Sequence, residues 1–225
     1  LTLSGGIDST TIYTLIKEKL NKDIELFTFI HPGSPTNEYS KVKKLVDSYG
    51  DSVITVQSED SNNFKDIEND LDVVEFPIWG TSTRAYIDMY DAIKKAGFKV
   101  VIEGHGSDEQ LGGYPYMIES AFYDYLKQGN FFKAYEMLKV EQATSHSGLG
   151  NKRNFMFKKF SRAIARFIIK HKDIKYFQEN IDWTVEFKIL PIVLRAFDRL
   201  SMNSSLESRA PFMDYRVVEL FKKLP

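Results

Sequence analysis

The sequence predicts an α/β fold, with a doubly wound and mostly parallel sheet over residues 1–114 and an all-helical part over residues 115–225. In the first part, short apolar runs alternate with amphipathic stretches, which is the pattern of parallel strands joined by crossover helices. After Tyr114 the strand patterns stop, and aromatic and aliphatic side chains recur at helical spacing. No internal repeat or long Gly/Ser linker separates the two parts, so we expect them to pack directly on each other.

Four strands and four helices are expected in the first part. The strands are short apolar runs at residues 1–3, 24–30, 52–56 and 99–103. Apolar side chains at helical spacing predict helices around residues 12–20, 42–49, 64–74 and 82–96, and Gly50 and Gly97 end the second and the fourth. This alternation places the end of each strand close to the start of a helix.

The bulk composition excludes several kinds of function. The formal net charge of -1 gives no general attraction to nucleic acid or to anionic membranes. Without cysteine, the chain cannot form a disulfide, a thiolate nucleophile or a cysteine-built zinc site. No signal-peptide pattern and no apolar run of bilayer length is present, so a cytoplasmic location without a membrane partner is expected. The chain starts within a strand pattern, lacks an initiator methionine and stops after a helical pattern, so we interpret it as a fragment.

A glycine-rich loop lies where the first strand ends and the next helix begins, which is where an open α/β sheet binds ligands. Two consecutive glycines let the backbone approach a phosphate, and the N–H groups and hydroxyls around them donate to its oxygens. A carboxylate beside a polyphosphate is tolerated when both ligate one cation, so Asp8 predicts Mg²⁺. A Gly-Gly turn with Asp8 or Ser9 capping the helix is the structural alternative. The residues expected at the phosphates are Ser4, Gly5, Gly6, Asp8, Ser9 and Thr10.

This loop is neither a Walker loop nor a dinucleotide-binding GxGxxG motif. Its letters, LSGGIDST at residues 3–10, resemble the ATP-pyrophosphatase family, in which SGGxDS binds the pyrophosphate end of ATP. The resemblance implies an adenine nucleotide alpha hydrolase-like fold with a PP-loop, and cleavage of ATP between its α and β phosphates. The family includes asparagine, NAD, GMP and argininosuccinate synthetases and several tRNA-modifying enzymes.

A second glycine-rich motif follows the fourth strand, at residues 103–114, on the same rim of the expected sheet. Its letters, EGHGSDEQLGGY, are similar to the SGEGSDExFGGY segment of asparagine synthetases. Glycines there allow close approach to a nucleotide, and Asp108 supplies a second carboxylate for the metal opposite Asp8. The structural alternative is a loop in which Ser107 or Asp108 caps a helix.

Two further segments carry the resemblance to asparagine synthetases over nearly the whole chain. Residues 190–202 resemble LPxLLRxxDRxSM, and residues 206–214 resemble ExRxPFLD. Glu207 and Arg209 in the latter face the substrate or form an interdomain clamp, and both interpretations stay open. A smaller match at residues 32–35 is similar to the loop beside the adenine, which would place the backbone of Phe29 against the base.

The sequence departs from the asparagine synthetase pattern at His105, where the family has a glutamate that faces aspartate. A histidine can hydrogen-bond a substrate or transfer a proton, but it does not offer a fixed negative charge to an amino group. The substitution therefore puts aspartate in doubt as the substrate, unless it is a tolerated change in a loop. A zinc site of His105, Asp108 and Glu109 is disfavoured, because the other histidines lack ligand spacing.

The resemblance implies the chemistry and its participants. ATP and Mg²⁺ are the implied cofactors, a small-molecule carboxylate (aspartate or an analogue) is adenylated, and ammonia or another amine then forms an amide. The resemblance also implies a glutaminase domain upstream of this chain and a catalytic lysine beyond Pro225. A second copy of the chain is a candidate partner. The implied catalytic residues are Asp8, His105, Asp108 and Arg209, the metal ligands are Asp8 and Asp108, and the adenosine contacts are Leu3, Phe29, Glu103 and Gly104.

Three alternatives to asparagine synthesis remain open at this point. A ring-forming amide synthetase of the same family is compatible with His105. A tRNA-modifying relative draws support from the basic residues 152–172, although their apolar positions recur at helical spacing and favour an amphipathic helix with a solvated basic face. A relative that binds nucleotides without catalysis is the third. Because the amphipathic-helix interpretation of residues 152–172 is favoured, nucleic acid is a disfavoured partner.

Overall fold

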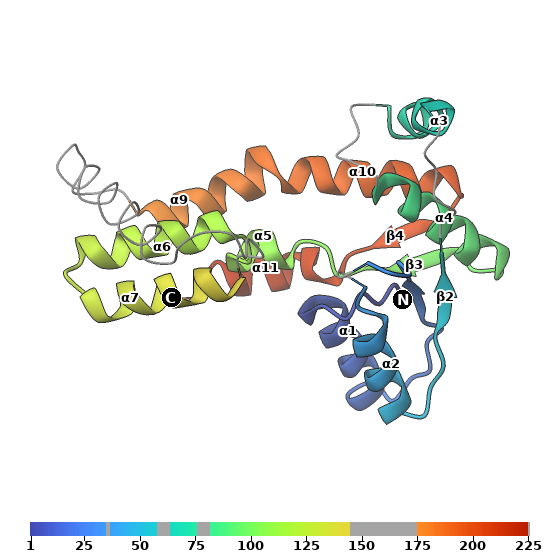
Figure 1. Cartoon of the computed structure of the whole chain (residues 1–225), viewed down its shortest axis with the longest axis horizontal. Coiled ribbons are helices and arrows are strands. Elements are labelled where there is room, and N and C mark those ends of the chain that lie inside the picture. Colours follow the sequence, from blue (N-terminus) through green and yellow to red (C-terminus); the bar gives the residue numbers. More distant parts are fainter. Residues whose placement is uncertain (35–36, 58–63, 76–81, 145–174, 225) are drawn as a thin grey trace. The chain divides into compact units, whose positions relative to one another are not determined.

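The computed structural model describes residues 1–34, 37–57, 64–75, 82–144 and 175–224 (Figure 1). The chain forms two compact units, which we describe separately. The sheet unit comprises Leu1–Ser107 and Ile192–Pro225, and the helical unit comprises Asp108–Pro191. The chain thus leaves the sheet unit after Ser107 and returns to it at Ile192, whereas the sequence suggested a single division after residue 114.

Short parallel strands form the centre of the sheet unit. They are β1 (Phe27–Phe29) paired with β2 (Ile54–Val56), and β3 (Val100–Ile102) paired with β4 (Glu207–Arg209). Residues 1–3 join the two pairs: Thr2 forms a parallel bridge with Phe27, and its N–H donates to the carbonyl of Ile102 at 3.2 Å. The neighbour order is therefore β2, β1, residues 1–3, β3, β4. The predicted mixed α/β character with parallel strands is confirmed.

The strand β4 corrects the prediction that everything after residue 114 is helical. Glu207 donates its N–H to the carbonyl of Lys99, and Glu103 donates to the carbonyl of Arg209, so this segment pairs along β3. Glu207 and Arg209 are exposed and only Ser208 is half-buried. A three-residue strand without an apolar side chain gives no hydrophobic pattern, because pairing with β3 determines its conformation.

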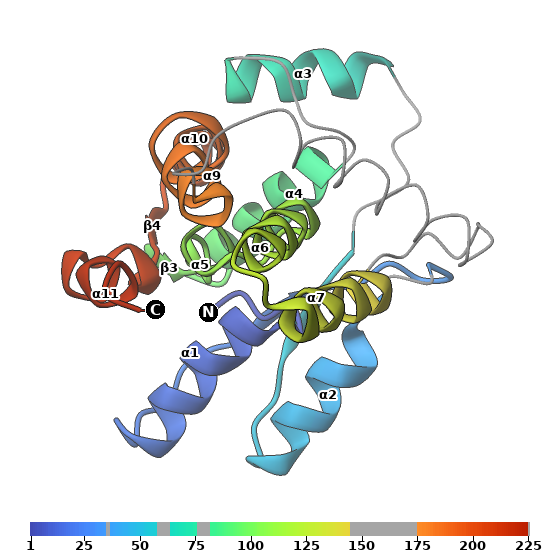
Figure 2. The same cartoon turned by 90° about the vertical axis from the view of Figure 1, so that its left-hand side faces the viewer.

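Helices cover both faces of the strands (Figures 1 and 2). The helices α1 (Ile7–Glu18) and α2 (Tyr39–Ser48) lie on one face, and α4 (Ser82–Lys95) with the larger part of α10 (Leu190–Asn203) lies on the other. Side chains alternate between two cores, as strand geometry requires: Leu26 joins the α1–α2 core, and Phe27 joins the α4–α10 core. The second core also contains Val74 from α3 (Phe64–Val74).

The four helices predicted in the first part are present as α1 to α4, and Gly50 and Gly97 adopt φ angles of 72° and 90° just after α2 and α4. Near the end of the sheet unit, the chain forms the 3-10 helix η2 (Pro211–Met213) and α11 (Tyr215–Phe221). None of the helices in the described part of the chain has the length and apolar character needed to cross a membrane.

The helical unit consists of helices that pack through aromatic side chains. They are α5 (Ser107–Leu111), which starts at the last residue of the sheet unit, α6 (Pro115–Lys127), α7 (Phe131–Thr144), α9 (Tyr176–Trp183) and the π-helix η1 (Thr184–Lys188). Phe122, Tyr123, Ala134 and Leu138 form the small core between α6 and α7. The basic stretch 152–172, predicted to be an amphipathic helix, lies outside the described residues.

A side chain of α6 caps the start of α9. The carboxylate of Asp124 accepts hydrogen bonds from the N–H groups of Tyr176 at 2.9 Å and Phe177 at 2.8 Å, while the N-cap residue Lys175 supplies no side-chain cap. We expect Asp124→Ala to lower the free energy of unfolding by about 1–2 kcal/mol, as loss of a helix cap does. Unfolding in urea measures this change in the free energy of unfolding. The exposed Asp182, which accepts from the Gln178 amide, is the matched control, and an equal loss in Asp182→Ala would contradict the capping role.

Candidate active site

The first glycine-rich loop is folded by hydrogen bonds between its own serines. The hydroxyls of Ser4 and Ser9 lie 3.1 Å apart, the Ser4 N–H donates to Ser9 Oγ at 3.2 Å, and the Gly6 N–H donates to Ser4 Oγ at 3.3 Å. Ser9 is buried and Ser4 is exposed, and the hydroxyls of both serines are engaged within the loop. Gly5 has a φ of 75°, a conformation in which glycine is favoured.

The helix α1 begins directly after this loop, at Ile7. Gly6 is its N-cap and provides no side-chain hydrogen bond, and the Thr10 N–H makes the first-turn bond to the Gly6 carbonyl at 3.2 Å. The capping role considered for Asp8 or Ser9 is therefore wrong. A helix start without a side-chain cap leaves backbone N–H groups available to an anion, and the partial positive charge of the helix dipole favours one there.

The second glycine motif approaches the same helix start. A Cβ built on Gly104 would lie 3.0 Å from the Asp8 Cβ and 3.0 Å from the Ser9 backbone nitrogen, so a larger residue would crowd the start of α1. Residues 1–3 and β3 are neighbours at the centre of the sheet, and the chain order of the strands reverses between them. Ligands of open α/β sheets bind at this reversal, beyond the carboxyl ends of the strands. The structure thus brings together Ser4, Gly5, Gly6, Asp8, Ser9, Thr10 and Gly104.

The other predicted metal ligand, Asp108, belongs to the helical unit, whereas Asp8 belongs to the sheet unit. Asp108 is in the first turn of α5. A Cβ added to Gly113 would overlap the Oδ1 atom of Asp108, so the Asp108 side chain packs directly against Gly113. Within the ranges that the structure describes, no group of three or more His, Asp or Glu side chains is placed to hold a metal ion. Shared binding of Mg²⁺ by Asp8 and Asp108 stays a prediction.

Glu103 buries its side chain among hydroxyl groups, and the adenosine contact expected largely through its backbone stays a prediction. The Tyr90 hydroxyl donates to both carboxylate oxygens at 2.8 and 2.9 Å, and the Ser208 hydroxyl donates to Oε2 at 2.5 Å. Burial raises the pKa of Glu103, but His105, Ser208 and Tyr90 together outweigh it, so the pKa lies below its ordinary value. Burial and the Glu103 charge raise the pKa of Tyr90 well above its ordinary value. Glu103 is therefore a buried carboxylate that the fold keeps ionised.

His105 lies beside this carboxylate. Its ring stacks on Phe197 of α10, with centroids 3.8 Å apart, and its Nε2 atom is 3.6 Å from Glu103 Oε1. That separation is too long for a hydrogen bond, and the buried Nε2 atom has no hydrogen-bond partner among the described residues. The imidazole thus lies against the Phe197 ring and beside the buried carboxylate, and its role in substrate binding or proton transfer stays a prediction.

Arg209 is the last of the predicted catalytic residues. Arg209 is mostly exposed, and its Nε donates to Glu207 Oε1 at 2.9 Å, so this ion pair contributes little to stability. Neither the clamp nor the substrate-facing role of Arg209 is decided by that geometry. Asp214 caps α11 by accepting from the Arg216 N–H at 3.0 Å, and the hydrogen bonds from Arg216 lower the pKa of Asp214 to about 2.

Two of the residues expected to contact adenosine, Leu3 and Phe29, lie in or beside the strands, and their contact with adenosine stays a prediction. Leu3 is buried in the α1–α2 core, and Phe29 is the last residue of β1, with its ring 4.6 Å from that of His31. Pro35, in the segment expected beside the adenine, lies outside the described residues. Tyr90 and Ser208 were not singled out by the sequence analysis, although a glutamate at the end of a buried strand is a signal that such partners exist.

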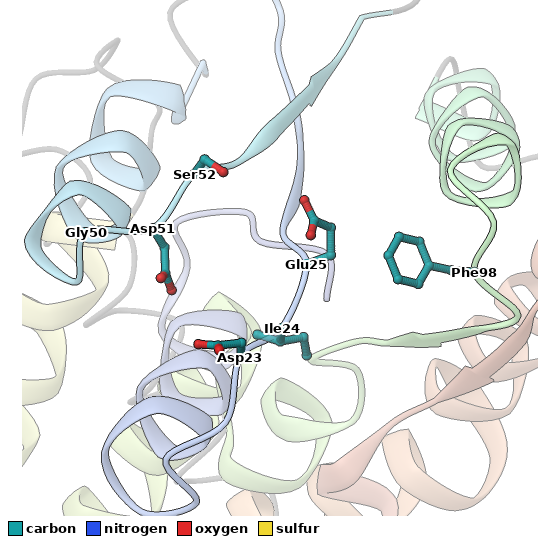
Figure 3. A pocket seen from close by; sticks show the side chains of 7 residues that line it. All are labelled: Asp23, Ile24, Glu25, Gly50, Asp51, Ser52 and Phe98. Carbon is teal, nitrogen blue, oxygen red and sulfur yellow. The ribbon is translucent and has the colours of Figure 1, made fainter.

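A pocket in the sheet unit lies at the opposite ends of the strands. Its lining residues precede β1, β2 and β3, and Figure 3 shows their side chains around the opening. Asp23, Glu25 and Asp51 make it acidic, although Asp51 also contacts Lys17 at 3.0 Å. The pocket lies at the other ends of the strands from the glycine-rich loops, so it is separate from the candidate nucleotide site.

Comparisons with known proteins agree with this geometry. The asparagine synthase family matches residues 1–225. The chain is 30% identical to the glutamine-hydrolysing asparagine synthetase of Sandersonia aurantiaca over 175 residues, which cover 70% of the chain and 33% of that protein. It is 25% identical to the amidase chry2 of Gibberella zeae over 126 residues, covering 50% of the chain and 19% of that protein. The aligned part of the chain therefore spans a third or less of each of these two relatives. The match along its whole length shows that the chain belongs to the asparagine synthase family.

Proposed function

We propose that the chain adenylates a substrate carboxylate with ATP and then passes the acyl group to an amine, forming an amide with release of AMP and pyrophosphate. The observation that carries this proposal is the close approach of Gly104 to the start of α1, which joins the two glycine-rich loops on one rim of the sheet. With helices on both faces, the strand order supports a doubly wound, adenine nucleotide alpha hydrolase-like fold, in which that rim binds the nucleotide.

The loop residues suit a polyphosphate. The uncapped start of α1 presents N–H groups and a partial positive charge, and Ser4 in the adjoining loop is an exposed residue. Asp8 in the first turn brings an unfavourable negative charge, and we assign it to a magnesium ion, as we do Asp108. When bound, Mg²⁺ neutralises charge on the phosphates and on the leaving pyrophosphate. Asp8 then holds that ion, while the N–H groups of α1 orient the phosphates.

For the acceptor, aspartate with ammonia derived from glutamine is the first candidate, because the more similar relative is a glutamine-hydrolysing asparagine synthetase. A ring-forming amide synthetase is the second candidate. The observation that favours it is the stacked His105 beside a buried carboxylate, since this arrangement suits proton transfer from an amine better than binding of an α-ammonium group.

An ATP/pyrophosphate exchange assay on the full-length protein tests the proposal. We expect exchange that depends on an added carboxylate, with L-aspartate tested first and β-amino acids after it, and that is lost when EDTA removes the metal. Amide formation without added ammonium or glutamine would favour the ring-forming reaction. Nucleotide-dependent thermal stabilisation without any pyrophosphate exchange would instead indicate a non-catalytic relative. A salt-sensitive gel shift with tRNA would point to the tRNA-modifying alternative.

A further inference from the structure

A buried network of side chains surrounds the carboxylate of Glu103, which the proposed chemistry does not itself use. Glu103 is 1% exposed, Tyr90 is fully buried, and Ser208 reaches the carboxylate from β4. The network thus joins α4, β4 and the residue that follows β3. Burying an ionised carboxylate is costly unless charged or polar partners compensate it, so a network of this kind needs a reason beyond packing.

The partners leave one direction of the carboxylate open, and His105 occupies it. Ser208 donates to Oε2, Tyr90 donates to both oxygens, and the Nε2 atom of His105 faces Oε1 at 3.6 Å. The Phe197 ring stacks on one face of the imidazole and restricts its rotation. A carboxylate beside Nε2 favours the tautomer that carries its proton on Nε2, which leaves the lone pair on Nδ1.

We propose that Glu103 is a positioning residue that acts through His105, fixing the imidazole as the proton acceptor for the attacking amine in the second half of the reaction. This inference rests on the proposed function, and it names the group that receives the proton. The amine nitrogen forms a bond to the acyl carbon, the bond from that carbon to the AMP oxygen breaks, and AMP leaves with the electron pair. The amine proton passes to His105 Nδ1, and the Glu103 charge stabilises the resulting imidazolium.

The variant Glu103→Gln tests this role because it keeps the shape of the side chain and removes its charge. The amide oxygen of Gln still accepts from Tyr90 and Ser208 when it lies at the position of Oε2. The amide NH₂ group then faces His105 Nε2, which becomes an acceptor, so the ring proton moves to Nδ1. The lone pair is consequently on the wrong nitrogen for the amine.

Nitrogen NMR of the full-length protein labelled with ¹⁵N-histidine reads the tautomer directly, without any substrate. At a pH where the His105 ring is neutral, we expect the Nε2-protonated form in the unchanged protein and the Nδ1-protonated form in Glu103→Gln. The signal is assigned by its loss in His105→Asn. Tyr86→Phe is the matched control, since it removes a hydroxyl from the same helix, at a ring 6.4 Å from that of Tyr90, and should leave the tautomer unchanged. The same tautomer in both proteins would overturn the proposal.

Kinetics give a second readout that a merely structural role would not change. With hydroxylamine as the amine and L-aspartate as the carboxylate, we expect Glu103→Gln to lower kcat for hydroxamate formation by about 10²-fold, in the range of general base catalysis, with KM for hydroxylamine unchanged. Pyrophosphate exchange reports only the first half of the reaction, so it should fall much less than hydroxamate formation. Equal losses in both assays would contradict a role confined to the amine step.

Two further variants apply if Glu103→Gln does not fold. Ser208→Ala and Tyr90→Phe each remove one donor and retain the carboxylate charge that fixes the ring, so both should keep the Nε2-protonated tautomer, and an Nδ1-protonated ring in either would overturn the proposal. The outcomes also separate the two proposals. Failure of exchange in the unchanged protein contradicts the proposed function, whereas the NMR result decides the Glu103–His105 relationship by itself.

Discussion

Asp8→Ala is expected to reduce ATP/pyrophosphate exchange by about 10³-fold while the protein remains folded. Asp8 lies in the first turn of α1, where it is half-buried beside the glycine-rich loop. A carboxylate in this place is unfavourable for phosphate binding unless a cation lies between the two groups. Loss of the Asp8 carboxylate should therefore weaken binding of the metal ion and not merely change the conformation of the loop. A bound metal contributes several kcal/mol to phosphoryl chemistry, and each ~1.4 kcal/mol is a tenfold change in rate.

The metal dependence distinguishes this role from a structural one. The residual exchange of Asp8→Ala should require a higher Mg²⁺ concentration, and Asp108→Ala should behave in the same way if the two carboxylates share one ion. Asp23→Ala is the matched control, because Asp23 is a fully exposed aspartate of the same unit that contacts Lys17 at 3.1 Å. Exchange in Asp8→Ala that equals that of Asp23→Ala would show that Asp8 is not a metal ligand.

The sheet was predictable where burial fixes the sequence. All four expected apolar runs lie in the sheet. Burial explains Leu1, Leu3 and Phe27, whereas Ile54 of β2 and Val100 of β3 are apolar although they are exposed. Their lengths were less predictable: the run at residues 24–30 forms a strand only at Phe27–Phe29, because a strand exists only where a neighbour pairs with it. For the same reason β4 gave no signal, since its position depends on hydrogen bonds to β3 and not on its own side chains.

The candidate site was predictable to the extent that glycine reports backbone geometry. Gly5 adopts a positive φ, and Gly104 approaches the start of α1 closely, so at both positions the residue type itself is the signal. The role of Glu103 was not predictable, because its partners Tyr90 and Ser208 come from segments 13 and 105 residues away in the chain. A local motif shows a polar residue at a strand end, but only the fold shows whether it faces a ligand or the interior.

Gly104→Ala should abolish most of the exchange activity, by about 10²-fold, because it separates the two glycine-rich loops. The added Cβ would lie 3.0 Å from the Asp8 Cβ and from the Ser9 backbone nitrogen, and 3.3 Å from the Asp8 carbonyl carbon. These atoms belong to the first turn of α1. They move aside less easily than the end of a long, flexible side chain would. The neighbours must shift by a few tenths of an ångström to admit the Cβ. Overpacking of this kind costs about 1–3 kcal/mol, which corresponds to about 10- to 10²-fold in rate when the shift reaches the reacting groups.

A comparison with Gly97→Ala separates this displacement from a general loss of stability. Gly97 has a φ of 90°, and a Cβ added to it would meet nothing within 4 Å, so alanine there strains the backbone at a distance from both loops without displacing a neighbour. Both variants should unfold at lower urea concentrations than the unchanged protein, but only Gly104→Ala should lose exchange. If both lost exchange in proportion to their stability, the close approach of Gly104 to α1 would be a packing feature alone. Loss confined to Gly104→Ala would instead tie the contact between the second loop and α1 directly to nucleotide chemistry.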